Sequence, residues 1–109
     1  MLNNAIGFKK IYLATGFTDL RIGIEGLASI ARFQFNLDPY DKDTLFLFCV
    51  RRSDRTKALL WEGDCFLLMY KRLNTGAFAW PRSADEAIEI GEYQYHQLMQ
   101  GFQLLPDIR

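Results

Sequence analysis

A pair of apolar runs on either side of Gly63 and Asp64 constrains the fold of this chain more than any other feature. A Gly-Asp pair between strand-forming runs is typical of a two-residue hairpin turn, because glycine adopts positive φ there without steric cost. The turn fixes a register in which Trp61 pairs with Phe66. Both faces of the hairpin are then apolar: one carries Leu59, Trp61, Phe66 and Leu68, and the other carries Ala58, Leu60, Leu67 and Met69. One helix covers one face, so the second face needs the C-terminal segment or another subunit.

The rest of the chain predicts further strands and two helices. Strands are expected over residues 8–14, 44–50, 57–62, 65–71 and 86–90, with a short one over 77–80. Helices are expected over residues 20–33, capped by Thr18 or Asp19, and over residues 91–99, closed by Gly101 and with Tyr95, Leu98 and Met99 on the buried side. The sequence therefore predicts a single α+β domain over residues 1–109, in which an antiparallel meander of about four to five strands packs with these two helices.

Composition limits the kinds of partner that this chain can have. Half of the residues are hydrophobic, which excludes intrinsic disorder. The 13 basic and 13 acidic residues cancel, so a nucleic acid must be attracted locally rather than by net charge. The sequence has no apolar run long enough to span a membrane, and its start does not look like a signal peptide. A cytoplasmic protein with no membrane partner is expected.

Basic residues gather at one end of the predicted hairpin. Six of them are expected there: Arg51, Arg52, Arg55, Lys57, Lys71 and Arg72. Arginine can hold two phosphate oxygens at once, and Ser53 adds a hydroxyl donor, so the cluster favours a phosphate-bearing partner. The aromatic residues considered for base stacking are Trp61, Tyr70 and Trp80, although Trp61 lies toward the other end of the hairpin. The alternative is a solvated loop whose cations form salt bridges with Asp54.

Signals for catalysis, metals or cofactors are weak. His96 is the only histidine, and on a helix it is more often a surface or packing residue than a general base. The two cysteines and one histidine do not make a zinc site. Asp38, Asp41 and Asp43 lack the regular ligand loop of a calcium site and are more typical of a turn. No phosphate-cradling glycine loop is present, so we expect no enzyme activity and no cofactor.

The cysteines and two helical glycines give further expectations. If Val50 pairs with Lys57, Cys49 and Cys65 lie at opposite ends of the sheet, about 13 Å apart along the strands, so both thiols should be free. Gly23 and Gly26 are unusual inside the predicted helix over residues 20–33. They indicate either close packing of that helix on the sheet or the close approach of a partner or phosphate.

The order of motifs along the chain resembles a known family. The motifs are Thr18-Asp19 before Arg21 and Gly23, then Arg51-Arg52 with Asp54-Arg55, Lys57, Trp61, Gly63-Asp64, Tyr70-Lys71-Arg72-Leu73, Gly76, Phe78 and Trp80-Pro81. From about residue 11 to residue 81, this order resembles the small TnpB-type accessory protein, the product of the second open reading frame, of bacterial insertion sequences of family 66. Ile22 and Ala77 stand where basic residues are usual in that family, Glu62 where aspartate is usual and Cys65 where glycine is usual.

The resemblance implies a role in transposition beside a separate transposase, without catalysis. The positions that it marks as functional surface are Arg21, Arg51, Arg52, Arg55, Lys57, Lys71 and Arg72. Together with the basic cluster, it leads to the hypothesis of an accessory factor that contacts DNA phosphates through one end of the sheet. The rival hypothesis is an interaction module that docks on the transposase, or forms a homodimer, through an apolar sheet face.

Overall fold

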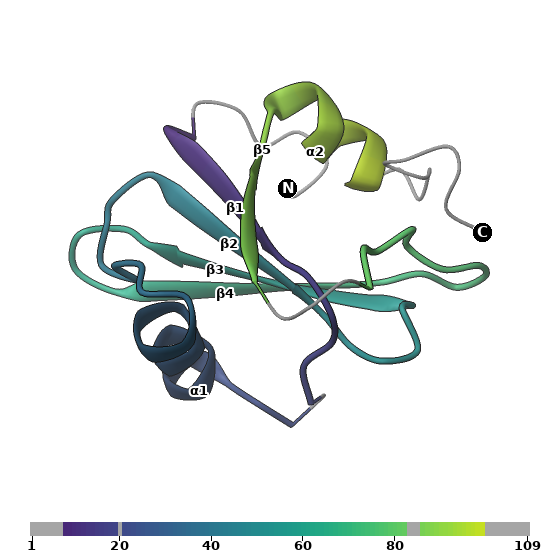
Figure 1. Cartoon of the computed structure of the whole chain (residues 1–109), viewed down its shortest axis with the longest axis horizontal. Helices are drawn as coiled ribbons and strands as arrows, with labels where there is room; N and C mark the ends of the chain where they lie inside the picture. The colour runs from purple at the N-terminus through teal and green to yellow at the C-terminus, as the bar shows by residue number, and fades with distance from the viewer. Residues whose placement is uncertain (1–7, 20, 83–85, 100–109) are drawn as a thin grey trace.

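The computed structural model describes residues 8–19, 21–82 and 86–99. Its elements in chain order are β1 (Lys10–Ala14), α1 (Ile24–Ser29), the π-helical continuation η2 (Ile30–Gln34), β2 (Thr44–Cys49), β3 (Arg55–Trp61), β4 (Phe66–Arg72), β5 (Ala87–Ile90) and α2 (Glu92–Met99). Figure 1 shows α1 and α2 on opposite faces of one sheet. The predicted α+β class is confirmed.

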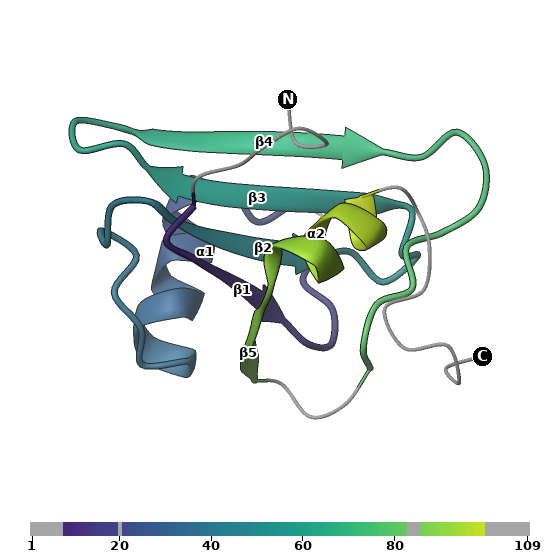
Figure 2. The ribbon, with the colours of Figure 1, turned by 90° about the horizontal axis from the view of Figure 1, so that it is seen from above.

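The five strands form one sheet in the order β4-β3-β2-β1-β5, which Figure 2 shows from above. Strands β2, β3 and β4 form the predicted antiparallel meander, and β5 pairs antiparallel with β1. Strand β1 runs parallel to β2, with Leu13 beside Leu47, because the chain crosses over through α1 between them. This parallel pair makes the sheet mixed and was not predicted.

The predicted hairpin register is confirmed. Trp61 lies opposite Phe66 and Leu59 lies opposite Leu68, while Gly63 adopts a φ of 101° in the turn. A backbone hydrogen bond of 2.9 Å from Glu62 N to Cys65 O closes the turn. The local pattern of two apolar runs and a glycine turn was therefore sufficient to position β3 against β4.

The predicted pairing of Val50 with Lys57 is wrong. Lys57 lies opposite Phe48, and the amide of Val50 donates to the carbonyl of Arg55 at 3.2 Å. The connection between β2 and β3 is shorter than expected because Ser53 adopts a φ of 63°, which closes a tight turn. The shift is by two residues, so each side chain keeps its face.

Both cysteines are free, as predicted, with Cys49 buried and Cys65 exposed. The loop over residues 36–43 forms as expected, with Asn36 and Asp43 at positive φ. Among the described residues, no helix is long and apolar enough to cross a membrane.

The predicted cap of the first helix is wrong. The amide and hydroxyl of Thr18 both donate to the carbonyl of Cys49, at 2.8 and 3.3 Å, and Thr18 bridges Val50 in parallel. Asp19 caps a turn instead, since its carboxylate accepts from the amide of Arg21 at 2.9 Å. The helix begins later, at Ile24, so the segment before it is tied to the end of β2.

The two unusual glycines do not pack against the sheet. A β-carbon at Gly23 would meet no atom within 4 Å, whereas one at Gly26 would lie 2.6 Å from Cγ2 of Ile22. Gly26 therefore accommodates the side chain of Ile22 rather than a strand. The expectation of close helix-on-sheet packing fails at both positions.

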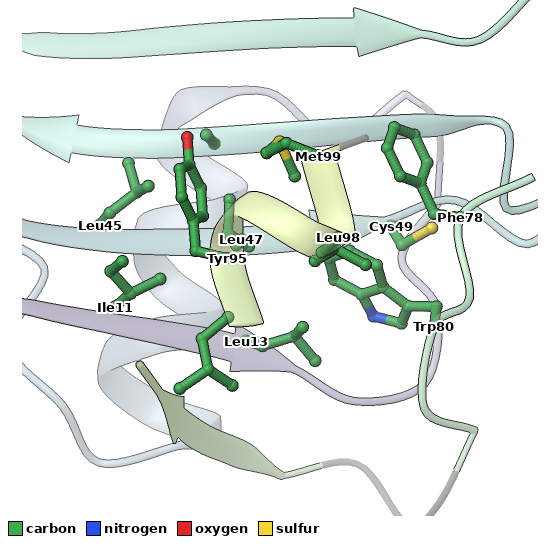
Figure 3. Close-up of a cluster of buried hydrophobic side chains, with 12 residues drawn as sticks. Ile11, Leu13, Leu45, Leu47, Cys49, Phe78, Trp80, Tyr95, Leu98 and Met99 are labelled. Carbon is green, nitrogen blue, oxygen red and sulfur yellow. The ribbon is translucent and has the colours of Figure 1, made fainter. Parts of the chain in front are cut away.

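Each face of the sheet has its own hydrophobic core. On the α1 face the buried residues are Ala14, Leu27, Ala31, Phe46, Phe48 and Leu59. On the other face, the cluster includes Leu13, Leu47, Phe78, Trp80 and the predicted buried residues Tyr95, Leu98 and Met99 (Figure 3). Helix α2 therefore covers the second face, one of the two solutions that the sequence predicted. The predicted closure of this helix by Gly101 lies outside the described residues.

The expected strand over residues 77–80 does not form. Instead, the amide of Phe78 donates to the carbonyl of Ser53 at 2.6 Å, and the indole Nε1 of Trp80 donates to the carbonyl of Ala14 at 2.7 Å. Through these two hydrogen bonds, residues 78–80 connect the β2–β3 loop with the end of β1. Both aromatic side chains are buried as a result.

Candidate nucleic-acid interface

The loop between β2 and β3 holds two exposed arginines on a fixed backbone. Ser53 N donates to Val50 O at 2.9 Å, and Leu73 N donates to Asp54 O at 2.8 Å. Figure 2 shows that the ends of β2 and β4 and the start of β3 lie at the same end of the sheet. We call this the arginine end. Arg51 and Arg52 are exposed on its loop.

A pocket of about 360 Å³ opens at the arginine end, and we call it the arginine pocket. Its lining residues are Phe17, Thr18, Asp19, Val50, Arg51, Arg52 and Arg55. The bridge between Thr18 and Val50 forms the pocket, because it places the segment after β1 beside the β2–β3 loop. Three of the predicted site residues therefore converge on one concave surface.

An additional arginine reaches this surface from a distant part of the chain. The guanidinium of Arg82 lies 5.6 Å from the centroid of the Phe17 ring, which is the geometry of a cation–π contact. The backbone holds them together, since Gly16 N donates to Pro81 O at 2.9 Å. No local pattern in the sequence indicates this pair. Arg82 and Phe17 were therefore missed as site residues.

Arg55 lines the pocket from the first position of β3. It is directly opposite Arg72 on β4, and Arg72 is exposed. The Nε of Arg55 is 3.9 Å from Oδ1 of Asp54, and both side chains are largely buried. In the part of the chain that the structure describes, Asp54 forms an ion pair with Arg55 and with no other arginine of the loop. The alternative hypothesis, a solvated loop whose cations form salt bridges with Asp54, therefore explains one of the three arginines Arg51, Arg52 and Arg55.

The two lysines of the predicted cluster point inward rather than to solvent. Lys57 is 8% exposed and its Nζ donates to the carbonyl of Ile22 at 2.7 Å. Lys71 is half-buried and its Nζ donates to the carbonyl of Met99. Desolvation lowers the pKa of both lysines. They fasten the segment before α1 and the end of α2 to the sheet, on opposite faces, and do not join the exposed arginines.

Arg21 is placed beside the pocket but is already paired. Its Nε and Nη2 donate to the two carboxylate oxygens of Asp19, at 3.1 and 2.8 Å. These hydrogen bonds from Arg21 lower the pKa of Asp19 to about 2. Arg21 therefore neutralises a carboxylate of the pocket lining.

The aromatic residues considered for stacking lie elsewhere. Trp61 packs with Tyr40 and Phe66 in a cluster at the Gly63 end of the sheet, and Trp80 is buried. Tyr70 remains 52% exposed on β4. Phe17 is thus the aromatic residue that lines the arginine pocket.

The acidic residues and the histidine make local contacts. Asp41 is paired with Lys9 at 3.1 Å, and the carboxylate of Asp38 accepts from the amide of Tyr40 at 3.0 Å. Within residues 8–19, 21–82 and 86–99, no group of three metal-ligating side chains gathers. His96 lies on α2, with its Nε2 3.8 Å from a carboxylate oxygen of Glu92.

Comparisons with known proteins agree with the motif order. The chain is 35% identical over 92 residues to the uncharacterized protein y4hO of Sinorhizobium fredii (strain NBRC 101917 / NGR234). The matched region covers 84% of this chain and 79% of that protein. It is 32% identical over 92 residues to the uncharacterized protein y4jC of the same strain, covering 84% and 78%. No solved structure matches. The family model described as "IS66 Orf2 like protein" matches residues 9–107, and the chain therefore belongs to the IS66 Orf2-like family.

Proposed function

We propose that this protein is a non-catalytic accessory factor of DNA transposition that contacts DNA phosphates through the arginine end of the sheet. Family membership suggests the accessory role. The observation that carries the DNA contact is the convergence of Arg51, Arg52 and Arg55 on one pocket. It works in the cytoplasm, beside a separate transposase, without a cofactor.

The chemistry of the arginine end suits a phosphate backbone. Guanidinium groups hold two phosphate oxygens in a fixed geometry, and backbone hydrogen bonds fix the loop that carries Arg51 and Arg52 before binding. The chain has no net charge, so attraction to DNA must come from a local positive surface such as this one. Arg72 and Arg82, both exposed, extend the positive surface beyond the pocket.

The experiment is a salt titration of DNA binding with a matched pair of variants. Each phosphate contact contributes a slope of about 0.9 in log affinity against log salt for duplex DNA. The double variant R51A/R52A should therefore lower the slope by about two and weaken binding. The control variant K10A/K42A removes two exposed cations from the other end of the sheet and should leave the slope unchanged. If R51A/R52A binds DNA with the wild-type slope, the proposed surface is wrong.

A second candidate function is supported by the edge strand β4. Leu67 is half-buried, and it belongs to neither of the two core clusters that the described residues form. Its cross-strand partner Leu60 is also only half-buried. An apolar position at a sheet edge is suited to a protein partner, either the transposase or a second copy of this chain.

This candidate is tested by size-exclusion chromatography and by co-purification with the transposase. Leu67→Asp should abolish either association in a protein that remains folded by circular dichroism, and high salt should leave the wild-type association intact. Leu67→Val preserves the apolar surface and serves as the control. Association that survives Leu67→Asp would eliminate this surface as the docking site.

A further inference from the structure

We propose that the arginine pocket binds one unpaired nucleotide of single-stranded DNA, with its base against Phe17 and its phosphate held by the loop arginines. This inference rests on the proposed function, because it takes DNA as the ligand and specifies which form of DNA the site accepts.

The shape and lining of the pocket suit a ligand that is both aromatic and anionic. A volume of about 360 Å³ is at the lower end of the range for small-molecule sites, which is about 300–1,000 Å³. Phe17 supplies an aromatic ring, and Arg51, Arg52 and Arg55 supply the cations. Stacking of bases on aromatic rings combined with a positively charged surface is the usual means of binding single-stranded nucleic acid.

Arg82 strengthens the aromatic part of the site. Its guanidinium lies 5.6 Å from the Phe17 centroid, so it orients the ring and adds a further cation at the rim. Phe17 is partly buried against the core on the α2 face, which limits its rotation. The ring is therefore held in its orientation before the ligand arrives, and little ordering of Phe17 is needed on binding.

The position of the cations favours unpaired over duplex DNA. Duplex readout usually inserts a protruding helix or a β-ribbon into a groove. Here the arginines line a concave surface, and the acidic residues Glu25 and Glu92 occupy the first turns of α1 and α2. A duplex also keeps its bases stacked on each other, so Phe17 would have no base to contact.

Asp19 gives the pocket a polarity. Its Oδ1 accepts from the backbone amide and the Nε of Arg21, whereas its Oδ2 accepts only from Nη2 of Arg21 and retains a lone pair that can accept from the amino group of a base. A phosphate oxygen is an acceptor and cannot donate to this lone pair, so the position suits an amino donor rather than a second phosphate. The arrangement therefore suits one base and one phosphate better than two phosphates.

The test compares three DNA probes by fluorescence anisotropy: a single strand, the same strand with abasic sites, and the corresponding duplex. The single strand has about 12 nucleotides, which is within the site size of one single-strand-binding module. With the wild-type protein, the abasic strand should bind about five- to a hundred-fold more weakly than the intact strand, the range that the loss of one stacked base gives. Equal affinity for the intact and the abasic strand would overturn the inference, and this comparison needs no variant that might fail to fold.

Variants locate the effect in the protein. Phe17→Leu keeps an apolar side chain and removes the ring, so it should weaken binding of the intact strand by the same factor, about five- to a hundred-fold, and leave duplex and abasic binding unchanged within about two-fold. Phe17→Tyr keeps the ring and should bind like the wild type. If the Phe17→Tyr variant binds the intact strand no better than the Phe17→Leu variant, base stacking is contradicted.

The variant R51A/R52A distinguishes the inference from the proposed function on which it rests. If this variant loses affinity for all three probes while Phe17→Leu changes none, the DNA contact stands and the nucleotide pocket is wrong. If neither variant changes the affinity of any probe, both proposals are wrong.

Discussion

Arg55 lies directly opposite Arg72 in the antiparallel pair of β3 and β4, so two like charges face each other at the arginine end of the sheet. Like charges at directly opposed positions destabilise a sheet, whereas opposite charges contribute about 0.2–1 kcal/mol. The carboxylate of Asp54, which is 3.9 Å from Nε of Arg55, opposes this repulsion. On the proposed function, a phosphate bound between these arginines would reduce the repulsion, and DNA binding would then stabilise the folded protein.

The first prediction follows from this repulsion. Arg72→Thr should raise the free energy of unfolding by about 0.2–1 kcal/mol, because it removes a like charge and introduces a strand-forming residue. The same change should weaken DNA binding, since an exposed cation beside the pocket is lost. Urea denaturation measures the first effect and anisotropy the second. Lys10→Thr, at the other end of the sheet, is the control for both; an Arg72→Thr protein that is less stable than the wild type would contradict the repulsion.

The second prediction separates the inward lysine from the exposed arginines. Lys57→Ala should lower the free energy of unfolding by about 1–3 kcal/mol, because the carbonyl of Ile22 loses its donor, and should leave the salt slope of DNA binding unchanged. Arg52→Ala should change the free energy of unfolding by less than about 0.5 kcal/mol but lower the salt slope of DNA binding by about one. Chemical denaturation and salt titration of both variants check the pair. A smaller salt slope for Lys57→Ala would show that this lysine contacts phosphate.

The hairpin of β3 and β4 and the buried side of α2 were predictable because both depend on residues close in sequence. A turn glycine at position 63 and the alternation of apolar residues determine the hairpin register without reference to the rest of the chain. The parallel pairing of β1 with β2 depends on the path of the crossover between them, which no local pattern encodes. The prediction of the helix cap was wrong for the same reason: the hydroxyl of Thr18 donates to the carbonyl of Cys49, which is distant in the sequence.

The candidate site was predictable to the same extent. Arg51, Arg52 and Arg55 stand together in the sequence and converge in the structure. Phe17 and Arg82 meet only because the segments that carry them are joined by a long-range backbone bond, so neither was detectable from a local pattern. The inward direction of Lys57 could have been predicted from the sequence, because Lys57 shares a sheet face with buried Leu59 and that face is covered by α1.

The third prediction concerns the bond that joins the segment after β4 to β1. Trp80→Phe removes the donor of the 2.7 Å hydrogen bond to the carbonyl of Ala14, so it should lower the free energy of unfolding by about 1–3 kcal/mol. For a domain of this size, each kcal/mol lowers the melting temperature by about 4–8 °C. Trp61→Phe keeps a ring in the half-buried cluster with Tyr40 and is the control. Thermal denaturation by circular dichroism measures both, and equal melting temperatures would show that the Ala14 bond contributes little.

The fourth prediction uses the two free thiols. Alkylation of the folded protein should modify exposed Cys65 and spare Cys49, which is buried and whose pKa burial raises to about 12. A side-chain hydrogen bond with Asp64 raises the pKa of Cys65, and desolvation and the negative charges of Asp64 and Glu62 raise it further. The midpoint of its rate–pH profile should therefore lie above that of an ordinary thiol, and Asp64→Asn should move the midpoint to lower pH while keeping a turn-forming residue.

Mass spectrometry after timed labelling with iodoacetamide measures the rates, and full labelling of Cys49 in denaturant is the control. A midpoint that Asp64→Asn leaves unchanged would show that the turn carboxylate does not act on Cys65.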